Sequence, residues 1–116
     1  MKKYLALKPN SHATHLKLEL YYNLGGYNNF TCKQESRGFY LSACPVKRET
    51  HELEPGQTYT TEAFMVFTGT KVLVKAVSRK SAKAEREAEQ AMLEWEQNLI
   101  DYVLTNNHLE LEGVPA

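Results

Sequence analysis

The stretch SRKSAKAEREAEQAMLEWEQNLIDYVL, residues 78–104, decides the fold class, because it is the longest segment with a helical pattern. It consists largely of strong helix formers, and no Gly or Pro interrupts it. Apolar side chains recur in it at three- and four-residue spacing, which places them in one stripe along the helix. The stripe consists of Ala84, Ala88, Ala91, Met92, Trp95, Leu99, Tyr102 and Val103. The pattern predicts an amphipathic helix over about residues 79–105, with Ser78 or Ser81 as its N-cap.

Short alternating segments precede the helix and predict strands. In residues 15–24 the side chains of one parity are Leu16, Leu18, Leu20, Tyr22 and Leu24, which is typical of a half-buried strand. Similar patterns predict strands at 3–7, 27–33, 39–46, 59–67 and 71–77.

The turns between these segments predict which strands pair. Gly25-Gly26 favours a hairpin of 15–24 with 27–33, and Thr68-Gly69-Thr70 favours a hairpin of 59–67 with 71–77. Pro45 cannot donate to a ladder, so the strand 39–46 is expected to end there or to lie on an edge. Residues 47–58 show neither periodicity and are predicted to form the longest loop.

Strands followed by a single helix predict an α+β fold. We expect an antiparallel sheet of about four to five strands, with one long C-terminal helix packed across one face. The helix stripe, Trp95 included, is predicted to pack on the strand face that bears Leu16, Leu18 and Leu20. Residues 1–116 are expected to form one domain, with strands within 3–77 and a frayed tail at 108–116.

Composition limits the class of protein. The 116 residues are 42% hydrophobic and 24% charged, which is typical of one soluble domain and leaves no room for a second. No run approaches the ~20 apolar residues that span a bilayer. The apolar run near the N-terminus is too short for a signal peptide. We therefore expect a cytoplasmic protein without a membrane partner.

The charges are unevenly distributed along the chain. Residues 1–80 carry 12 basic and 6 acidic side chains, and residues 81–116 carry 2 basic and 8 acidic ones. The zero net charge excludes a uniformly basic nucleic-acid binder. The split fits either an acidic, solvated helix beside a basic sheet, or a basic surface for an anionic partner.

The residues that could bind a metal lack any metal-binding spacing. They are Cys32, Cys44, His12, His15, His51 and His108. None of them forms a CxxC, HxxxH or HExxH motif, so we expect free, reduced cysteines and no metal or other cofactor.

No motif for catalysis is present either. The two cysteines and the many hydroxyl side chains lack a nucleophile elbow or another local motif. Glu49, Glu52 and Glu54 alternate with His51 and could supply paired carboxylates, but solvated charge explains them better. The sequence therefore predicts no catalytic residues and a protein that is not an enzyme.

A basic run leads into the helix. It comprises Lys71, Lys75, Arg79, Lys80 and Lys83, and a helix N-terminus with such neighbours is a natural anion site. Residues 78–84 resemble the start of the last helix in double-stranded-RNA-binding domains, where lysines contact phosphates. That family opens with a helix, however, and here Glu85, Glu87 and Glu89 follow and would repel phosphate.

Three segments together resemble a second group of proteins. Residues 18–28, residues 37–42 and residues 78–85 are similar to small uncharacterised proteins carried by mobile elements of gut Firmicutes. The resemblance spans residues 1 to about 108. It implies a cytoplasmic accessory protein that binds nucleic acid or another protein, and it implies no catalytic residues.

Two functional hypotheses follow from the sequence. The first is a binding module that contacts nucleic acid through the basic run. The alternative is a protein-protein interaction or homodimerisation module that uses a sheet edge or an exposed aromatic face. The aromatic residues considered for that face are Tyr21, Tyr27, Phe39, Tyr40, Tyr59 and Phe67.

Overall fold

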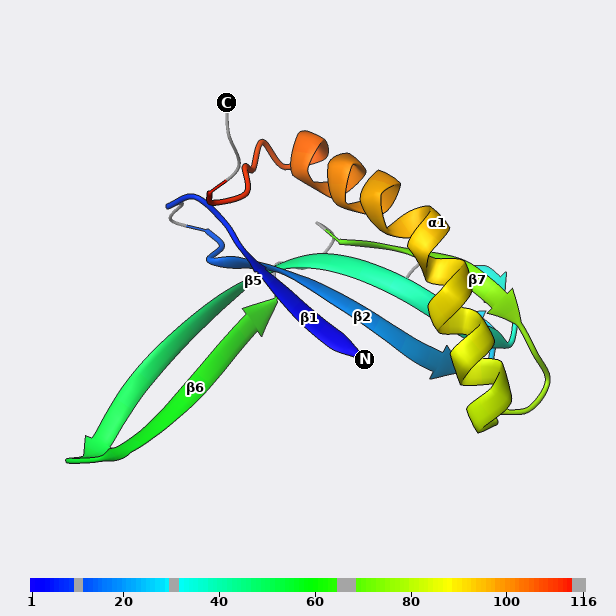
Figure 1. The fold of residues 1–116 in the computed structure, drawn as a ribbon, viewed down its shortest axis with the longest axis horizontal. Helices are drawn as coiled ribbons and strands as arrows, with labels where there is room; N and C mark the ends of the chain where they lie inside the picture. The colour runs from blue at the N-terminus through cyan, green and yellow to red at the C-terminus, as the bar shows by residue number, and fades with distance from the viewer. Residues whose placement is uncertain (10–11, 30–31, 65–68, 114–116) are drawn as a thin grey trace.

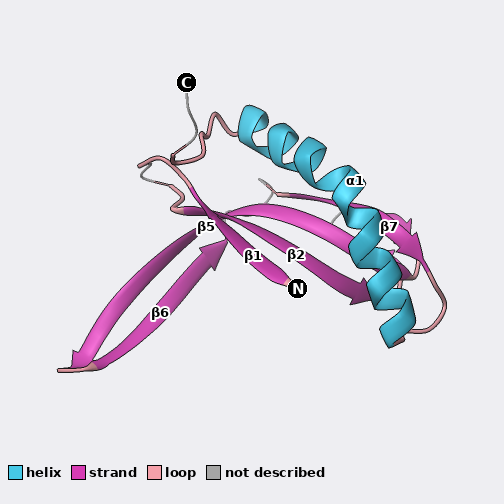
Figure 2. Ribbon diagram, in the orientation of Figure 1, coloured by secondary structure: helices cyan, strands magenta, loops and turns pink. Residues whose placement is uncertain are grey.

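A computed structural model of the chain describes residues 1–9, 12–29, 32–64 and 69–113. Its strands are β1 (Lys2–Ala6), β2 (His15–Asn23), β3 (Gly26–Asn28), β4 (Lys33–Glu35), β5 (Gly38–Glu54), β6 (Gln57–Phe64) and β7 (Thr70–Ala76), and its helix is α1 (Ala82–Asn106). Figure 2 shows the one helix lying across one face of the sheet. The predicted α+β class, an antiparallel sheet with a long C-terminal helix, is confirmed.

β5 is the central strand of the sheet. It pairs antiparallel with β2 on one side, and β2 pairs with β1. On the other side β7 pairs with the first part of β5, and β6 pairs with its last part. The predicted hairpin between residues 59–67 and 71–77 is therefore wrong, because both strands pair with β5. Part of the expected turn and strand, residues 65–68, lies outside the described residues.

The hairpin predicted at Gly25-Gly26 is also wrong. β2 pairs with β5, so its alternating leucines lie beside apolar residues of β5 on the same face of the sheet. The polar β3 pairs with β4 in a separate two-stranded sheet. The reason is burial, because β5 offers Leu41 and Ala43 opposite Leu20 and Leu18, whereas residues 26–28 have no apolar face to match.

Residues 47–58 are not a loop. β5 continues to Glu54, turns at Pro55-Gly56, and returns as β6. Gly56 has a φ of +84°, a conformation that glycine adopts without strain.

The expectation for Pro45 is wrong as well, because this proline lies buried within β5. Its missing N–H faces the gap between the end of β7 pairing at Ala43 and the start of β6 pairing at Val46.

The core lies between α1 and the sheet face that bears Leu16, Leu18 and Leu20, as predicted. From the helix it takes Ala84, Ala88, Met92, Leu99, Ile100 and Val103. Trp95 is the main correction, because it is 45% exposed. Tyr102, seven residues later on the same helix stripe, is exposed too, so the buried stripe is centred to one side of these two aromatic residues.

The C-terminal segment is tied to the sheet beyond the helix. Lys8 N–H donates to Glu110 O, and Glu112 N–H donates to Ala6 O, each at 2.9 Å. Leu109 and Leu111 pack against the core. The frayed tail expected from His108 is therefore replaced by a paired segment up to Glu112, and residues 114–116 lie outside the described part of the chain.

Candidate nucleic-acid interface

The candidate site lies where β7 passes into α1. Ser81 is the N-cap, since its Oγ accepts a hydrogen bond from the N–H of Ala84 at 3.1 Å. The helix therefore begins at Ala82. Arg79 and Lys80 come just before the cap, Lys83 lies in the first turn, and all three side chains are exposed.

Arg37 joins this group from a distant part of the sequence. Its Nε donates to Leu24 O at 2.9 Å, and its Nη1 donates to Ser78 O at 3.4 Å. The close approach of β7 to the start of β5 depends on Gly38, because a Cβ at this position would lie 2.3 Å from Lys75 O. Arg37, Ala76, Val77 and Ser78 line an open hollow beside the helix start. We call Arg37, Arg79, Lys80 and Lys83 the basic corner.

Arg37 was not among the basic residues that the sequence predicted for the site. No local sequence pattern places Arg37 beside Ser78, because the two residues are brought together by the pairing of β5 with β7.

Lys71 does not belong to the basic corner. It lies on the sheet face away from α1, where it forms an ion pair with Glu35 and lies 5.1 Å from the centre of the Tyr40 ring. The pKa of Glu35 is lowered, chiefly by the hydrogen bond from Lys71, although partial burial opposes this shift. Lys71 is thus neutralised within the fold.

Lys75 is neutralised on the opposite face. Its Nζ lies 2.7 Å from the carboxylate of Glu87 on α1. That hydrogen bond is the main reason why the pKa of Glu87 is lowered. The five predicted residues therefore divide, and the structure brings only Arg79, Lys80 and Lys83 to one free surface.

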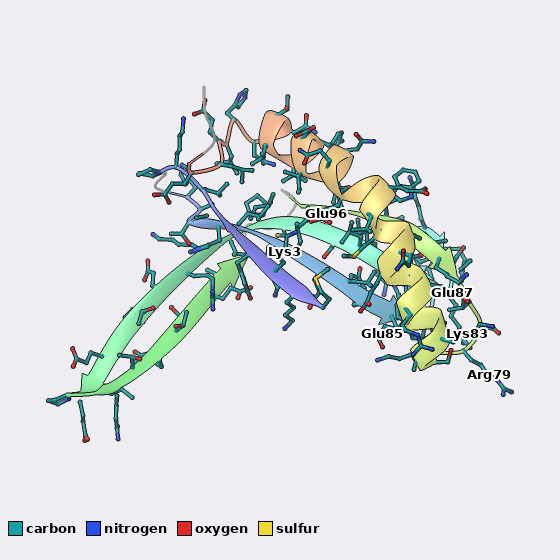
Figure 3. The ribbon with its side chains drawn as sticks, viewed as in Figure 1. Lys3, Arg79, Lys83, Glu85, Glu87 and Glu96 are labelled. Carbon is teal, nitrogen blue, oxygen red and sulfur yellow. The ribbon has the colours of Figure 1, made fainter. Side chains whose placement is uncertain are left out.

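Acidic residues on the first turns of α1 bound the basic corner. Figure 3 shows Glu85 and Glu87 on the same helical turns as Lys83. Glu87 is already paired with Lys75, and Glu85 is half-buried. The basic corner is therefore bordered by acidic side chains on the helix side, and one of them, Glu87, is already paired within the fold.

The predicted aromatic face does not form a stacking platform. Phe39 is in the core, and Tyr40 is only 7% exposed. Tyr21 stacks on Tyr40 with the ring centroids 6.0 Å apart. Tyr27 and Tyr59 are exposed on β3 and β6, which do not pair with each other. Phe67 lies outside the described residues.

A second polar cluster, which the sequence did not predict, lies where β5 and β6 leave the sheet. The carboxylate of Glu62 accepts from Lys17 Nζ at 3.0 Å and from Tyr4 Oη at 2.8 Å. The Arg48 guanidinium lies 3.8 Å from the same carboxylate and 4.1 Å from the centre of the Tyr4 ring. No sequence signal indicated this cluster, because its residues come from four different strands.

The charges of this cluster stabilise one another. Burial would raise the pKa of Glu62, but the hydrogen bonds from Tyr4 and Lys17 outweigh it and lower the pKa. Burial would likewise lower the pKa of Lys17, and the hydrogen bond to Glu62 raises it instead. A carboxylate held ionised by three partners is suited to anchoring β6 and poorly suited to accepting a proton in catalysis.

The carboxylates and histidine of residues 49–54 are part of a strand pair. His51 stacks on Tyr59 at 5.0 Å, and its Nε2 lies 3.2 Å from Thr61 Oγ1 and 3.7 Å from Glu49. Within the described ranges, no group of three or more His, Cys, Asp or Glu side chains is placed to hold a metal ion.

Comparison with family models, with curated proteins and with solved structures finds no match to this chain. The resemblances noted in the sequence therefore stay predictions. None of the described helices is long and apolar enough to cross a membrane.

Proposed function

We propose that this protein is a non-enzymatic binding module that contacts nucleic acid through the basic corner. The observation that carries the proposal is that Arg79, Lys80 and Lys83 flank the start of α1, with Arg37 hydrogen-bonded to Ser78 O beside them, and that none of these four side chains forms an ion pair with a described carboxylate. Lys71 and Lys75, in contrast, are each paired. Unpaired surface cations that share one corner are the groups that phosphates can neutralise.

The helix start adds to this positive charge. The first backbone N–H groups of a helix carry about half a positive charge, and Ser81 Oγ occupies only the one from Ala84. A phosphate beside Lys83 would therefore meet both a side-chain cation and backbone donors. These contacts are made to the sugar-phosphate backbone, so we expect little sequence preference. Such a role would suit the cytoplasmic accessory protein that the resemblance to mobile-element proteins implies.

The test is binding as a function of salt. The affinity of the parent protein for labelled duplex and single-stranded DNA and RNA is measured by fluorescence anisotropy from about 20 to about 200 mM salt. If each side chain contacts one phosphate, the combined substitution Arg79→Ala, Lys80→Ala and Lys83→Ala should reduce the slope of log K against log salt by roughly two to three on duplex DNA.

The matched control removes the same charge elsewhere. Lys2→Ala, Lys8→Ala and Lys47→Ala together change three exposed lysines that lie outside the corner and pair with Glu19, Glu110 and Glu49. The control variant should keep the slope of the parent. Equal losses in both variants would mean that net charge and not the corner drives binding, and no binding at low salt would remove the proposed function.

A further inference from the structure

The end of the β5 and β6 pair projects from the sheet as a two-stranded arm, which we define as residues 47–54 of β5 with 57–63 of β6. β2 and β7 stop pairing with β5 at Val46 and Ala43, so beyond these points β6 is the only described strand that pairs with β5. Figure 1 shows this arm extending away from the helix-covered body. An isolated two-stranded hairpin is at best marginally stable in water, and a third strand would stabilise it.

The ladder determines which backbone groups of the arm are free. Thr14 N–H donates to Val46 O, and Arg48 N–H donates to Thr14 Oγ1, so both β5 residues point away from β6. Backbone direction alternates along an antiparallel strand. In the observed register, the N–H and C=O groups of Thr58, Thr60 and Glu62 therefore face outward from β6.

The two edges of the arm differ in their protection. The β5 edge carries charged side chains at most positions between Lys47 and Glu54, and Thr14 covers its first free N–H group. Charged side chains are a common means of preventing edge pairing. The β6 edge has five uncharged and exposed residues in succession, 57–61, and three of them are threonine. This composition favours a strand and leaves the edge open to another one.

We propose that β6 pairs antiparallel with β6 of a second copy of this chain, about a two-fold axis at Thr60. This register places Thr60 opposite Thr60 of the second copy, and Thr58 opposite Glu62, so every outward-facing N–H and C=O group meets a complementary one. It also places Tyr59 opposite Thr61 and Gln57 opposite Ala63. No like charges face each other in this register. The same strand can therefore pair with its own copy, as a two-fold interface requires.

The pairing would join two arms into one four-stranded antiparallel sheet. It uses no residue of the basic corner, so it is independent of the proposed nucleic-acid binding. A dimer built on one strand pair is small by the standard of stable interfaces, and we expect a dissociation constant of about 1 to 100 μM.

Sedimentation equilibrium of the full chain from about 1 to about 300 μM tests the proposal, and the parent should convert from monomer to dimer over this range. Thr60→Pro removes the outward N–H group and leaves the β5 ladder intact, because that N–H faces away from β5. It should weaken dimerisation at least tenfold.

Thr50→Pro is the matched control. Thr50 lies directly opposite Thr60, and the two hydroxyl groups are 3.3 Å apart, so both variants lose the same side-chain contact. The N–H of Thr50 faces outward on the β5 edge, and Thr50→Pro should therefore dimerise like the parent. Circular dichroism and the melting temperature of both variants check that the arm and the body remain folded.

A cross-link tests the register directly. In an antiparallel hydrogen-bonded pair the two Cα atoms lie about 5.5 Å apart, which a disulfide can span. In a Cys32→Ser background, which removes the exposed thiol, Thr60→Cys should give a disulfide-linked dimer under mild oxidation, whereas Thr50→Cys should stay monomeric in a denaturing gel.

Three results would overturn the proposal: a monomeric parent at about 300 μM, a dimer that Thr60→Pro and Thr50→Pro affect equally, or cross-linking through Thr50→Cys in place of Thr60→Cys. Loss of nucleic-acid binding in the triple variant of the basic corner, with dimerisation unchanged, would support both proposals separately.

Discussion

Lys17 and Glu62 connect the centre of the sheet to the base of the arm, with Nζ and Oε1 3.0 Å apart. Lys17 is on β2 and Glu62 is on β6, two strands that do not pair with each other, and β5 lies between them. Their side chains are only 11% and 20% exposed, so water screens this ion pair less than the surface pairs of the molecule. The arm is therefore held at its base by a charge contact that spans β5.

Glu62→Gln should weaken the fold by about 1 to 3 kcal/mol near pH 7, because Lys17 and Arg48 then lose their shared anion in a partly buried place. The pKa of Glu62 is lowered in the folded state. Its contribution is therefore present above the ordinary carboxyl pKa and is lost as the pH falls through the folded value. Urea unfolding of parent and variant should differ most near pH 7, and the difference should shrink as the pH falls below the ordinary carboxyl pKa.

Glu49→Gln is the control for that measurement. Glu49 also pairs with a lysine, Lys47, at 3.3 Å, but both side chains are more than 40% exposed. Its removal should change the free energy of unfolding by less than about 0.5 kcal/mol at either pH. An equal effect of the two variants would contradict a structural role for the Glu62 cluster.

Ile100→Ala should cost about 2 to 5 kcal/mol, because Ile100 is buried between α1 and the sheet. Trp95→Ala should cost about 1 kcal/mol or less, although the residue is larger, because much of its side chain is in solvent. Each kcal/mol lowers the melting temperature of a domain of this size by roughly 4 °C. A larger loss for Trp95→Ala than for Ile100→Ala would place the wrong side of the helix against the sheet.

Replacing residues 50–60 with Asn-Gly should leave the body folded. The deletion keeps Glu49 and Thr61, whose backbone groups face each other, as the last pair of the shortened hairpin, and none of the core residues comes from the removed segment. The far-ultraviolet spectrum should keep its helical signal, and the melting temperature should fall by no more than about 5 °C. Loss of cooperative unfolding would show that the arm is part of the folding unit.

Cys32 should react with a thiol reagent much faster than Cys44. Cys32 is exposed, whereas Cys44 lies half-buried in β5. Burial is the main reason why the pKa of the Cys44 thiol is raised, so less of the reactive thiolate is present at neutral pH. Absorbance after adding a disulfide reagent should show one fast and one slow thiol. The Cys32→Ser variant should retain only the slow one, and a remaining fast phase would contradict the burial of Cys44.

Local periodicity was sufficient for the elements themselves and for the faces of the central strands. Residues 78–104 could form only a long amphipathic helix, since their apolar spacing and uninterrupted helix formers agree. Leu16, Leu18 and Leu20 had to share one buried face, because side chains alternate along a strand. The sequence also restricted the N-cap to Ser78 or Ser81, since a cap depends on neighbours three residues away, and the structure shows that it is Ser81.

Partner choice was decided by the tertiary structure. β6 and β7 both carry strand-forming residues, and nothing in their own sequence showed that both would lie along β5 and not against each other. The turn at Pro55-Gly56 and the burial available beside β5 decided this together. In the same way, the apolar stripe of α1 is wide enough to include Trp95, and only the position of the helix over the sheet showed which side of the stripe is buried.

The division of the basic residues has the same kind of cause. Lys71 and Lys75 are four residues apart in one strand, so regular alternation would place them on the same face. The pairing of β7 with β5 shifts register between Phe39 and Tyr40, and this irregularity turns Lys75 toward α1 while Lys71 stays on the opposite face. The sequence by itself thus determined which charges are present, and the tertiary structure determined which of them are neutralised, because pairing depends on distances that residues far apart in the chain acquire only on folding.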